Sequence, residues 1–182
     1  MRKSKLMKLI ALSSVLFVGA ILGLSSEAHA QWTPPPPLQT GPGVLYKIVN
    51  VNSGKVLDIA FNSKEASYRL HQWEYLGLPS QKWYLAGSEA GGYVVFNLNS
   101  GLVMEQTIPL YGDGAKIWQW WPNGTTQQNW RISNVMPTTI WNSLSGKVVD
   151  VEHNGTGNGA HIHQWQITPG VQSQLWRFER VN

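Results

Sequence analysis

"SQLWRFE" (residues 173–179) contains Gln174 and Trp176 two positions apart. The same Gln-x-Trp triplet occurs in "SQKWYLA" (80–86) and in "QQNWRIS" (127–133). The tryptophans of the three triplets, Trp83, Trp130 and Trp176, are separated by 47 and 46 residues. One such triplet is common in β-sheet proteins, but three at nearly equal intervals indicate an internal repeat.

Three further anchors align the same units. Each unit has a Ser-Gly dipeptide whose glycine lies four residues before an acid, and 15 residues after the acid comes a tryptophan preceded by Gln. The Gln-x-Trp triplet begins eight or nine residues later. The anchors are Ser53-Gly54, Ser100-Gly101 and Ser145-Gly146, then Asp58, Glu105 and Asp150, then Trp73, Trp120 and Trp165. The chain is therefore predicted to contain three repeats, 43–90, 91–135 and 136–182.

The local sequence of each repeat is typical of short β-strands. Runs of β-branched and aromatic residues are bounded by Gly, Ser, Asn and Pro. No segment after residue 30 keeps an apolar 3.6-residue period long enough to predict a helix. Four strands per repeat give about twelve strands in one domain, 43–182. Three equal units in a closed all-β domain predict a β-trefoil, because a propeller of three blades would leave its centre poorly filled.

The N-terminal 30 residues have the composition of a secretory signal peptide. A basic start, "MRKSKLMK", precedes an apolar stretch, and "EAHA" ends in a small-x-small pattern. We expect cleavage after Ala30 and a secreted protein. The alternative is a signal-anchor helix, because the apolar stretch is near the lower limit for a membrane span. Residues 31–42 contain five prolines and predict an extended, Pro-rich leader of little structure.

Charge and cysteine content exclude several classes. The predicted signal peptide holds four of the 14 Lys and Arg residues and one of the 10 Asp and Glu residues. The remainder has a formal net charge of +1 and no basic run, which argues against a nucleic-acid partner. The chain has no cysteine, so packing rather than disulfides must stabilise it. We expect no membrane insertion after signal cleavage.

The tryptophan of the Gln-x-Trp triplet and the tryptophan of the Gln-Trp pair are predicted to have different roles. On a strand, alternation would place the Gln and Trp of the triplet on one face, with the Trp in the barrel interior and the Gln amide needing partners. The other Trp precedes a turn-rich segment. Its flat ring suits the apolar face of a sugar, and a carboxylate can accept hydrogen bonds from two vicinal hydroxyls. The alternative is that these tryptophans are further core and that the acids cap turns.

The order "SGKVLDI…HQW…SQKW" resembles the ricin B-chain type (R-type, QxW) lectin repeat, also called the family 13 carbohydrate-binding module, and the resemblance covers residues 43–182. It implies up to three sugar pockets. In each, the acid binds hydroxyls, the aromatic stacks on the ring, a polar residue before the triplet adds a hydrogen bond, and the triplet's Gln orients the acid. His71 and His163 occupy a slot where the family often has Gln. The resulting candidates are Asp58, His71, Trp73, Ser80 and Gln81; Glu105, Trp120, Gln127 and Gln128; and Asp150, His163, Trp165, Ser173 and Gln174.

The second repeat departs most from the family pattern. Glu105 is one methylene longer than Asp and would place its oxygens in the sugar's space, and Gln106 replaces an apolar residue. We expect this pocket to be weak or silent, and we rank the third repeat first for completeness. The first repeat has Ala66-Ser67 where the others have Asp-Gly and Asn-Gly, so its loop is expected to differ in shape. Because the family's usual Asn before the triplet is replaced in all three repeats, no galactose preference is assumed.

No metal site or cofactor is predicted. His161 and His163 have strand spacing that would put both rings on one face, but two histidines without a nearby acidic ligand are weak evidence for a metal.

The sequence can be interpreted as one of three functional classes. The favoured one is a secreted carbohydrate-binding protein, not an enzyme, whose partners are glycans or polysaccharide. A glycoside hydrolase usually needs two carboxylates across one bond, whereas the candidate acids fall one per repeat. The third function is a trefoil whose sugar sites have decayed and which binds protein, as an inhibitor or a toxin accessory. The sequence favours no oligomeric state.

Overall fold

The computed structural model describes residues 38–107 and 112–182, and within them the fold is all-β. Twelve strands fall into three sets of four. The strands are β1 (Leu45–Asn50), β2 (Val56–Ile59), β3 (Leu70–Trp73), β4 (Trp83–Gly87), β5 (Tyr93–Asn97), β6 (Val103–Gln106), β7 (Ile117–Trp120), β8 (Trp130–Ile132), β9 (Ile140–Asn142), β10 (Val148–Val151), β11 (Ile162–Trp165) and β12 (Trp176–Val181). The predicted β-trefoil of three repeats is confirmed.

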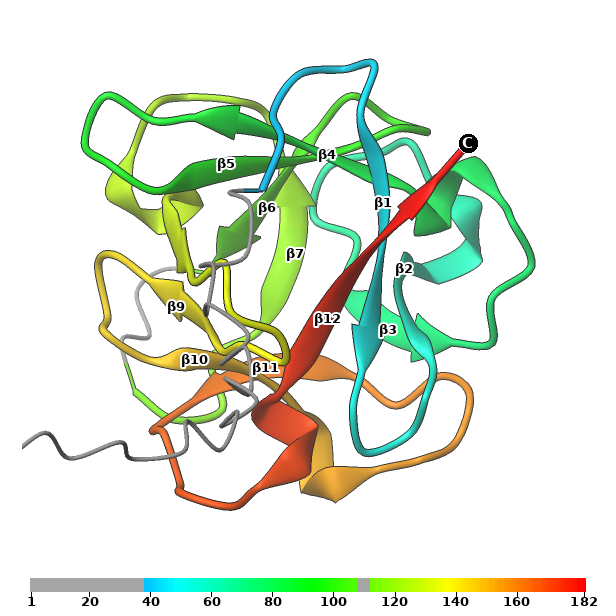
Figure 1. The fold of residues 1–182 in the computed structure, drawn as a ribbon, viewed down its shortest axis with the longest axis vertical. Helices are drawn as coiled ribbons and strands as arrows, with labels where there is room; N and C mark the ends of the chain where they lie inside the picture. Colours follow the sequence, from blue (N-terminus) through cyan, green and yellow to red (C-terminus); the bar gives the residue numbers. More distant parts are fainter. Residues whose placement is uncertain (1–37, 108–111) are drawn as a thin grey trace, which may run out of the picture. The chain divides into compact units, whose positions relative to one another are not determined.

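The first and fourth strands of each set close into a ring. Antiparallel pairing runs from β12 to β1, β4, β5, β8 and β9. Thr138, just before β9, pairs with Trp176 of β12 and completes the circuit. Figure 1 shows β1 and β12, from opposite ends of the described chain, lying side by side. Closure leaves none of these six strands with an unpaired edge for another chain to join.

The second and third strands of each set form a hairpin that carries the acid. β2 pairs with β3, β6 with β7 and β10 with β11. In each hairpin the acid lies directly opposite an aromatic or imidazole residue. The pairs are Asp58 with His71, Glu105 with Trp118, and Asp150 with His163. Cross-strand neighbours of this kind have Cβ atoms roughly 4.5–5.5 Å apart, so the register itself brings each acid to its ring.

The triplet tryptophans fill the interior, as predicted. Trp83, Trp130 and Trp176 are each 0% exposed. A buried indole needs a partner for its N–H group. Each Nε1 donates to the backbone carbonyl of the residue just before the acid: Trp83 to Leu57 (3.0 Å), Trp130 to Met104 (2.9 Å) and Trp176 to Val149 (3.0 Å).

The geometry predicted for the triplet glutamines was wrong. Gln81, Gln128 and Gln174 are not on strands but end short 3-10 turns, Pro79–Gln81, Thr126–Gln128 and Gln172–Gln174. The strand begins only at the following Trp. Tight turning, rather than strand alternation, is what carries each Gln side chain toward the acid.

The Ser-Gly turns are tied to the neighbouring repeat through the Gln of the Gln-Trp pairs. Gln72, Gln119 and Gln164 are fully buried. Each accepts a hydrogen bond from the serine hydroxyl of its own repeat, at 2.6–2.7 Å. Each amide Nε2 donates to backbone carbonyls of another repeat: Gln72 to the third, Gln119 to the first and Gln164 to the second. The three repeats are thereby interlocked in a cycle.

The expectation of a differently shaped loop in the first repeat was also wrong. Ser67 has φ 70°, close to the values of Gly114 (φ 82°) and Gly159 (φ 84°). What the first repeat lacks is a side-chain bond. Asp113 and Asn158 each accept a hydrogen bond from a backbone N–H of another repeat, whereas Ala66 has no side-chain acceptor.

Part of the predicted leader is ordered against the domain. The Leu38 side chain packs on the core, and the Gly41 N–H donates to the Leu85 carbonyl (2.8 Å). This differs from the expected lack of structure in this segment. The predicted signal peptide, 1–30, and residues 31–37 of the leader lie outside the described residues. Among residues 38–107 and 112–182, no helix has the length and hydrophobicity needed to cross a bilayer.

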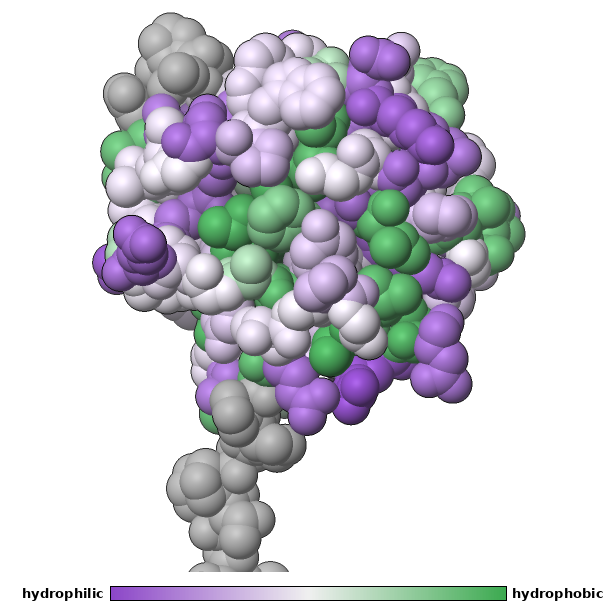
Figure 2. Space-filling view, turned by 90° about the horizontal axis from the view of Figure 1, so that it is seen from above, coloured by the Kyte–Doolittle hydropathy of each residue, from purple (hydrophilic) through white to green (hydrophobic). Residues whose placement is uncertain are grey.

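The surface is mixed in character. On the face drawn in Figure 2, apolar residues form several separate patches among polar ones, rather than one continuous area.

Replacing Trp130 with Phe should lower the free energy of unfolding by about 2–4 kcal/mol, because the change removes buried volume and leaves the Met104 carbonyl without its donor. Urea denaturation followed by circular dichroism measures it. Trp121→Phe is the matched control, since Trp121 is 61% exposed and its replacement should change the free energy little. Equal effects of the two variants would contradict the assigned role of Trp130.

Candidate functional site

Each repeat forms one pocket at its acid. The pockets are of similar design but unequal size, with volumes of about 450 Å³ in the first repeat, about 280 Å³ in the second and about 310 Å³ in the third. Asp58, His71, Trp73 and Ser80 line the first, Glu105, Trp120 and Gln127 the second, and Asp150, His163, Trp165 and Gln174 the third. The structure thus brings most of the predicted residues together, one set per repeat.

The tryptophan of the Gln-Trp pair in each repeat (Trp73, Trp120 or Trp165) forms a pocket wall and is not part of the core. Trp165 is 36% exposed, and Trp73 and Trp120 are half-buried. Each stacks on the residue two positions earlier on the same strand. The ring centroids are 5.4 Å apart for His71–Trp73, 5.1 Å for Trp118–Trp120 and 5.2 Å for His163–Trp165, with interplanar angles of 17–29°. A flat aromatic wall held by a second ring is therefore present in all three repeats.

The triplet glutamine holds both the acid and the loop beside it. Gln81 Nε2 donates to Asp58 Oδ2 (3.3 Å) and to the Glu74 carbonyl (2.8 Å), while its Oε1 accepts from the Leu76 N–H (2.7 Å). Gln128 and Gln174 make the same three types of bond in their repeats. These glutamines brace the acid from behind, and Gln81 and Gln128 do not line the pockets.

In the third pocket the serine and the acid satisfy each other, whereas His163 Nε2, like His71 Nε2 in the first pocket, has no hydrogen-bond partner within the described residues. Ser173 Oγ lies 2.6 Å from Asp150 Oδ1 and 2.7 Å from Asn154 Oδ1. His163 Nε2 is 3.5 Å from Asp150 Oδ2. Burial alone would raise the pKa of Asp150, but its interactions with His163, Ser173 and Gln174 outweigh burial and lower that pKa. The acid is therefore ionised at neutral pH and able to accept hydrogen bonds from hydroxyl groups.

In the second pocket the protein already engages both acid oxygens. Trp118 Nε1 donates to Glu105 Oε1 (3.0 Å), and Gln128 Nε2 donates to Oε2 (2.6 Å). The longer Glu side chain reaches the Trp118 indole, which stands where the other repeats have His. The indole N–H of Trp118 is a fixed donor, whereas in the third pocket the Ser173 hydroxyl has a second acceptor in Asn154 Oδ1 and can turn away from Asp150. Glu105 therefore offers less to a ligand than Asp150 does.

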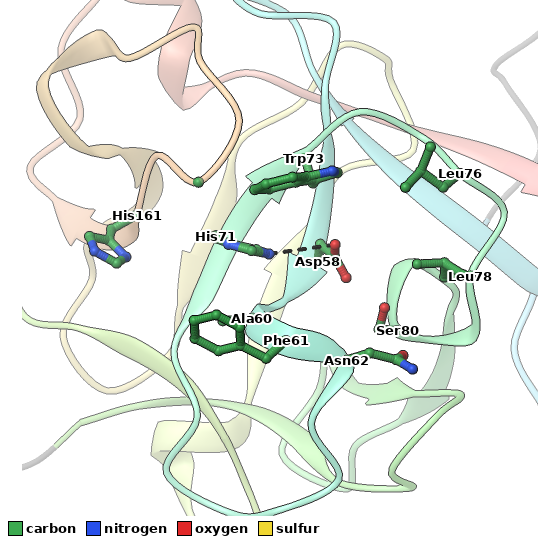
Figure 3. A pocket seen from close by; sticks show the side chains of 11 residues that line it. Asp58, Ala60, Phe61, Asn62, His71, Trp73, Leu76, Leu78, Ser80 and His161 are labelled. Carbon is green, nitrogen blue, oxygen red and sulfur yellow. Dashed lines mark ion pairs between the residues drawn. The ribbon is translucent and has the colours of Figure 1, made fainter.

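In the first pocket polar atoms are left without partners. Asp58 Oδ1, Ser80 Oγ and His71 Nε2 are buried and make no hydrogen bond within the described residues. His71 Nε2 is 3.5 Å from Asp58 Oδ2, too long for a good bond. Figure 3 shows Asp58 and His71 side by side, with Ser80 on the same side of the pocket as the Leu78 loop. Buried polar atoms without partners cost free energy that a ligand bearing hydroxyls can recover.

Sequence reasoning missed the turns that follow the acids of the first and third repeats. Ala60–Asn62 and Glu152–Asn154 form 3-10 turns in which Phe61 and His153 adopt positive φ, and these turns flank the first and third pockets. Comparing "IAFN" (59–62) with "VEHN" (151–154) would have revealed an Asn four residues beyond each of these two acids. The first pocket also includes Gly159 and His161 from the third repeat, which a repeat-by-repeat assignment cannot find.

The two histidines with strand spacing, His161 and His163, belong to different pockets. His161 lines the first and His163 the third. Within residues 38–107 and 112–182, no group of three or more His, Cys, Asp or Glu side chains is placed to hold a metal ion.

A closed three-repeat β-trefoil with an acid and a stacked aromatic wall in each repeat has the architecture of a lectin domain. The family model described as "Ricin-type beta-trefoil lectin domain-like" matches residues 28–120, 79–165 and 126–182, and the chain belongs to this family. A ricin B-like lectin fold suggests carbohydrate binding. No curated protein matches the chain.

Solved structures give the same fold. A designed 3-fold symmetric protein, ThreeFoil, is 29% identical over 75% of this chain and 99% of its own, with a TM-score of 0.72. An exo-β-1,3-galactanase from Clostridium thermocellum is 31% identical over 79% of this chain, with a TM-score of 0.74, but this chain spans 31% of the galactanase. The Macrolepiota procera ricin B-like lectin, solved in complex with lactose, is 18% identical over 80% of this chain and 100% of its own, with a TM-score of 0.67, and supports the fold alone.

The lowered pKa of Asp150 predicts a pH-dependent stability. A carboxyl whose folded pKa lies below its unfolded value stabilises the protein above the unfolded value, 3.8, and loses that contribution as pH falls through the folded pKa. The wild type should exceed Asp150→Asn in unfolding free energy at about pH 6, and the difference should shrink toward about pH 3.

Urea denaturation of both proteins across that pH range measures the difference. Glu89→Gln, at an exposed acid, is the control and should show a much smaller change with pH. A difference between wild type and Asp150→Asn that is constant with pH would contradict the assignment.

Proposed function

We propose that this protein is a secreted carbohydrate-binding protein that uses the first and third pockets and performs no chemistry. The observation that carries the proposal is the repeated juxtaposition of a buried acid, braced by Gln, with an open aromatic wall. The acid accepts hydrogen bonds from sugar hydroxyls, while the tryptophan face covers the apolar C–H face of the ring. A site of this kind recognises a sugar without attacking it.

The arrangement of carboxylates favours binding over hydrolysis. Each of the three pockets has a single carboxylate among its described lining residues. Glycoside hydrolases usually place two across one glycosidic bond, roughly 5–9.5 Å apart. The galactanase similarity covers 31% of that enzyme, so it supports a shared module rather than a shared activity.

The partner we propose is a glycan or polysaccharide with repeated sugar units. Lactose, bound by the Macrolepiota procera lectin, and the galactan implied by the name of the Clostridium enzyme make galactose-containing glycans reasonable first probes. Two sites on one rigid domain gain affinity by avidity when one glycan reaches both. Export with removal of residues 1–30 is part of the proposal, and N-terminal sequencing of the secreted protein tests it.

A glycan array with fluorescently labelled protein tests the main proposal. Asp58→Asn and Asp150→Asn each remove one charged acceptor, and each should weaken binding by about tenfold or more at its own site. The double variant should lose detectable binding, while circular dichroism confirms that it remains folded. Wild-type protein that binds no glycan, or a folded double variant that binds like the wild type, would overturn the proposal and favour a protein-binding trefoil with decayed sites.

The second pocket provides a matched control. Trp120→Ala removes its aromatic wall, and because Glu105 is already engaged by Trp118 and Gln128 we expect less than about a twofold change in glycan affinity. Trp165→Ala, the same change in the third repeat, should weaken binding by about tenfold. Isothermal titration with a glycan found on the array measures both. A large loss in Trp120→Ala would mean that the second pocket is active.

A further inference from the structure

The first pocket differs from the third in the chemistry of its rim. Phe61, Leu76 and Leu78 surround its mouth beside Trp73. The third pocket has His153, Thr168 and Val171 around its mouth. The first cavity is also larger, about 450 Å³ against about 310 Å³. The first pocket therefore has the same acid and aromatic wall as the third pocket, together with an additional apolar surface at its mouth.

Phe61 is held in an unfavourable conformation at this rim. Its backbone has φ 60° and ψ 20°, the left-handed region that bulky residues rarely adopt, and its side chain is 91% exposed. The corresponding His153 has the same conformation (φ 57°), but an imidazole is better tolerated there and is at ease in water. The left-handed conformation belongs to the turn in both repeats, but the turn does not require an exposed phenyl ring at this position, because His153 forms the same turn.

The leucines extend the apolar surface on the loop that follows β3. Leu76 is 57% exposed and Leu78 is 39% exposed. Figure 3 shows Trp73 and Phe61 on opposite sides of the His71–Asp58 pair, with Leu76 and Leu78 along one flank. A ligand between these walls would have apolar surface on three sides.

The floor of the same pocket carries polar atoms that can form hydrogen bonds with hydroxyl groups of a ligand. Asp58 Oδ1, Ser80 Oγ and His71 Nε2 are buried without hydrogen-bond partners. In the third repeat the equivalent Ser173 hydroxyl lies within bonding distance of both Asp150 and Asn154. An entirely apolar ligand would leave the floor unsatisfied, and a bare sugar would leave the rim exposed to water. One ligand that meets both demands has hydroxyls at one end and an apolar group at the other.

We propose that the first pocket binds a sugar whose anomeric oxygen carries an aryl or a longer alkyl group, with the sugar hydroxyls at Asp58 and Ser80 and the apolar group against Phe61, Leu76 and Leu78. This rests on the proposed function, because the floor is taken to hold a sugar. It goes further in making the two active pockets unequal: the first selects apolar glycosides and the third takes unsubstituted sugars.

The test uses the full mature chain carrying Asp150→Asn, which removes the contribution of the third pocket. Isothermal titration compares the methyl and phenyl β-D-glycosides of galactose, glucose and N-acetylglucosamine. For the sugar that binds, the phenyl glycoside should bind about tenfold tighter than the methyl glycoside, from burial of the added ring. In the Asp58→Asn protein, where the third pocket remains, the two glycosides should agree within about threefold.

Exchanging the rim residues keeps the turn intact. Phe61→His introduces the residue that the third repeat already carries in this conformation, and it should reduce the ratio of phenyl to methyl glycoside affinity from about tenfold to within about threefold. The reciprocal His153→Phe, in the Asp58→Asn protein, should create a phenyl preference at the third pocket. A second readout is the tryptophan fluorescence change on binding, which should remain in both variants.

The outcomes separate this inference from the proposed function. Equal affinities for the methyl and phenyl glycosides at the first pocket, or a phenyl preference unchanged by Phe61→His, would overturn the inference and leave carbohydrate binding intact. Failure to bind any glycoside here and any glycan on the array would overturn the proposed function itself, and the inference with it.

Discussion

Three buried indole N–H groups connect the core of this protein to its surface pockets. Each donates to the carbonyl of the residue immediately before a pocket acid, and the Gln two residues before the same indole donates to the carboxylate of that acid. The strand that carries the acid is thus fixed at two consecutive residues by one triplet. Removing a hydrogen bond from a buried carbonyl is costly, so the position of the acid is as well determined as the core.

Unequal pockets arise on an equal scaffold. The register of the three hairpins is identical, so the acid and its cross-strand neighbour occupy equivalent places in every repeat. The differences come from single side chains. In one pocket a Trp opposite the Glu donates to the carboxylate. In another a serine hydroxyl lies between Asp150 and Asn154, and in the remaining one the Ser80 hydroxyl has no partner within the described residues. The sequence-based ranking of the pockets treated them as better or worse copies, whereas the structure makes them chemically different.

The periodic features were predictable from the sequence and the local ones were not. Spacing of the triplets, the acids and the Ser-Gly turns gave twelve strands, buried Trp83 and its counterparts, and three acid–aromatic pockets. Spacing could not reveal that Gln81 ends a turn, because a residue two positions before a strand tryptophan is compatible with either geometry. Nor could it reveal Ser67 in the left-handed region, where its N–H donates to the Gln119 carbonyl of the second repeat (2.9 Å). Contacts between repeats, such as His161 at the first pocket, depend on how the units close.

The pairing of β1 with β12 places the two ends of the domain on one ribbon, with Leu45 opposite Val181. The interlocking glutamines run around the ring without regard to which repeat is synthesised first. Stability therefore depends on the cyclic order of the three repeats and not on where the chain is cut. A gene rearranged to begin at either of the other repeat junctions would therefore encode the same contacts between repeats. Because the two ends of the domain lie on one ribbon, either end can be joined to another module.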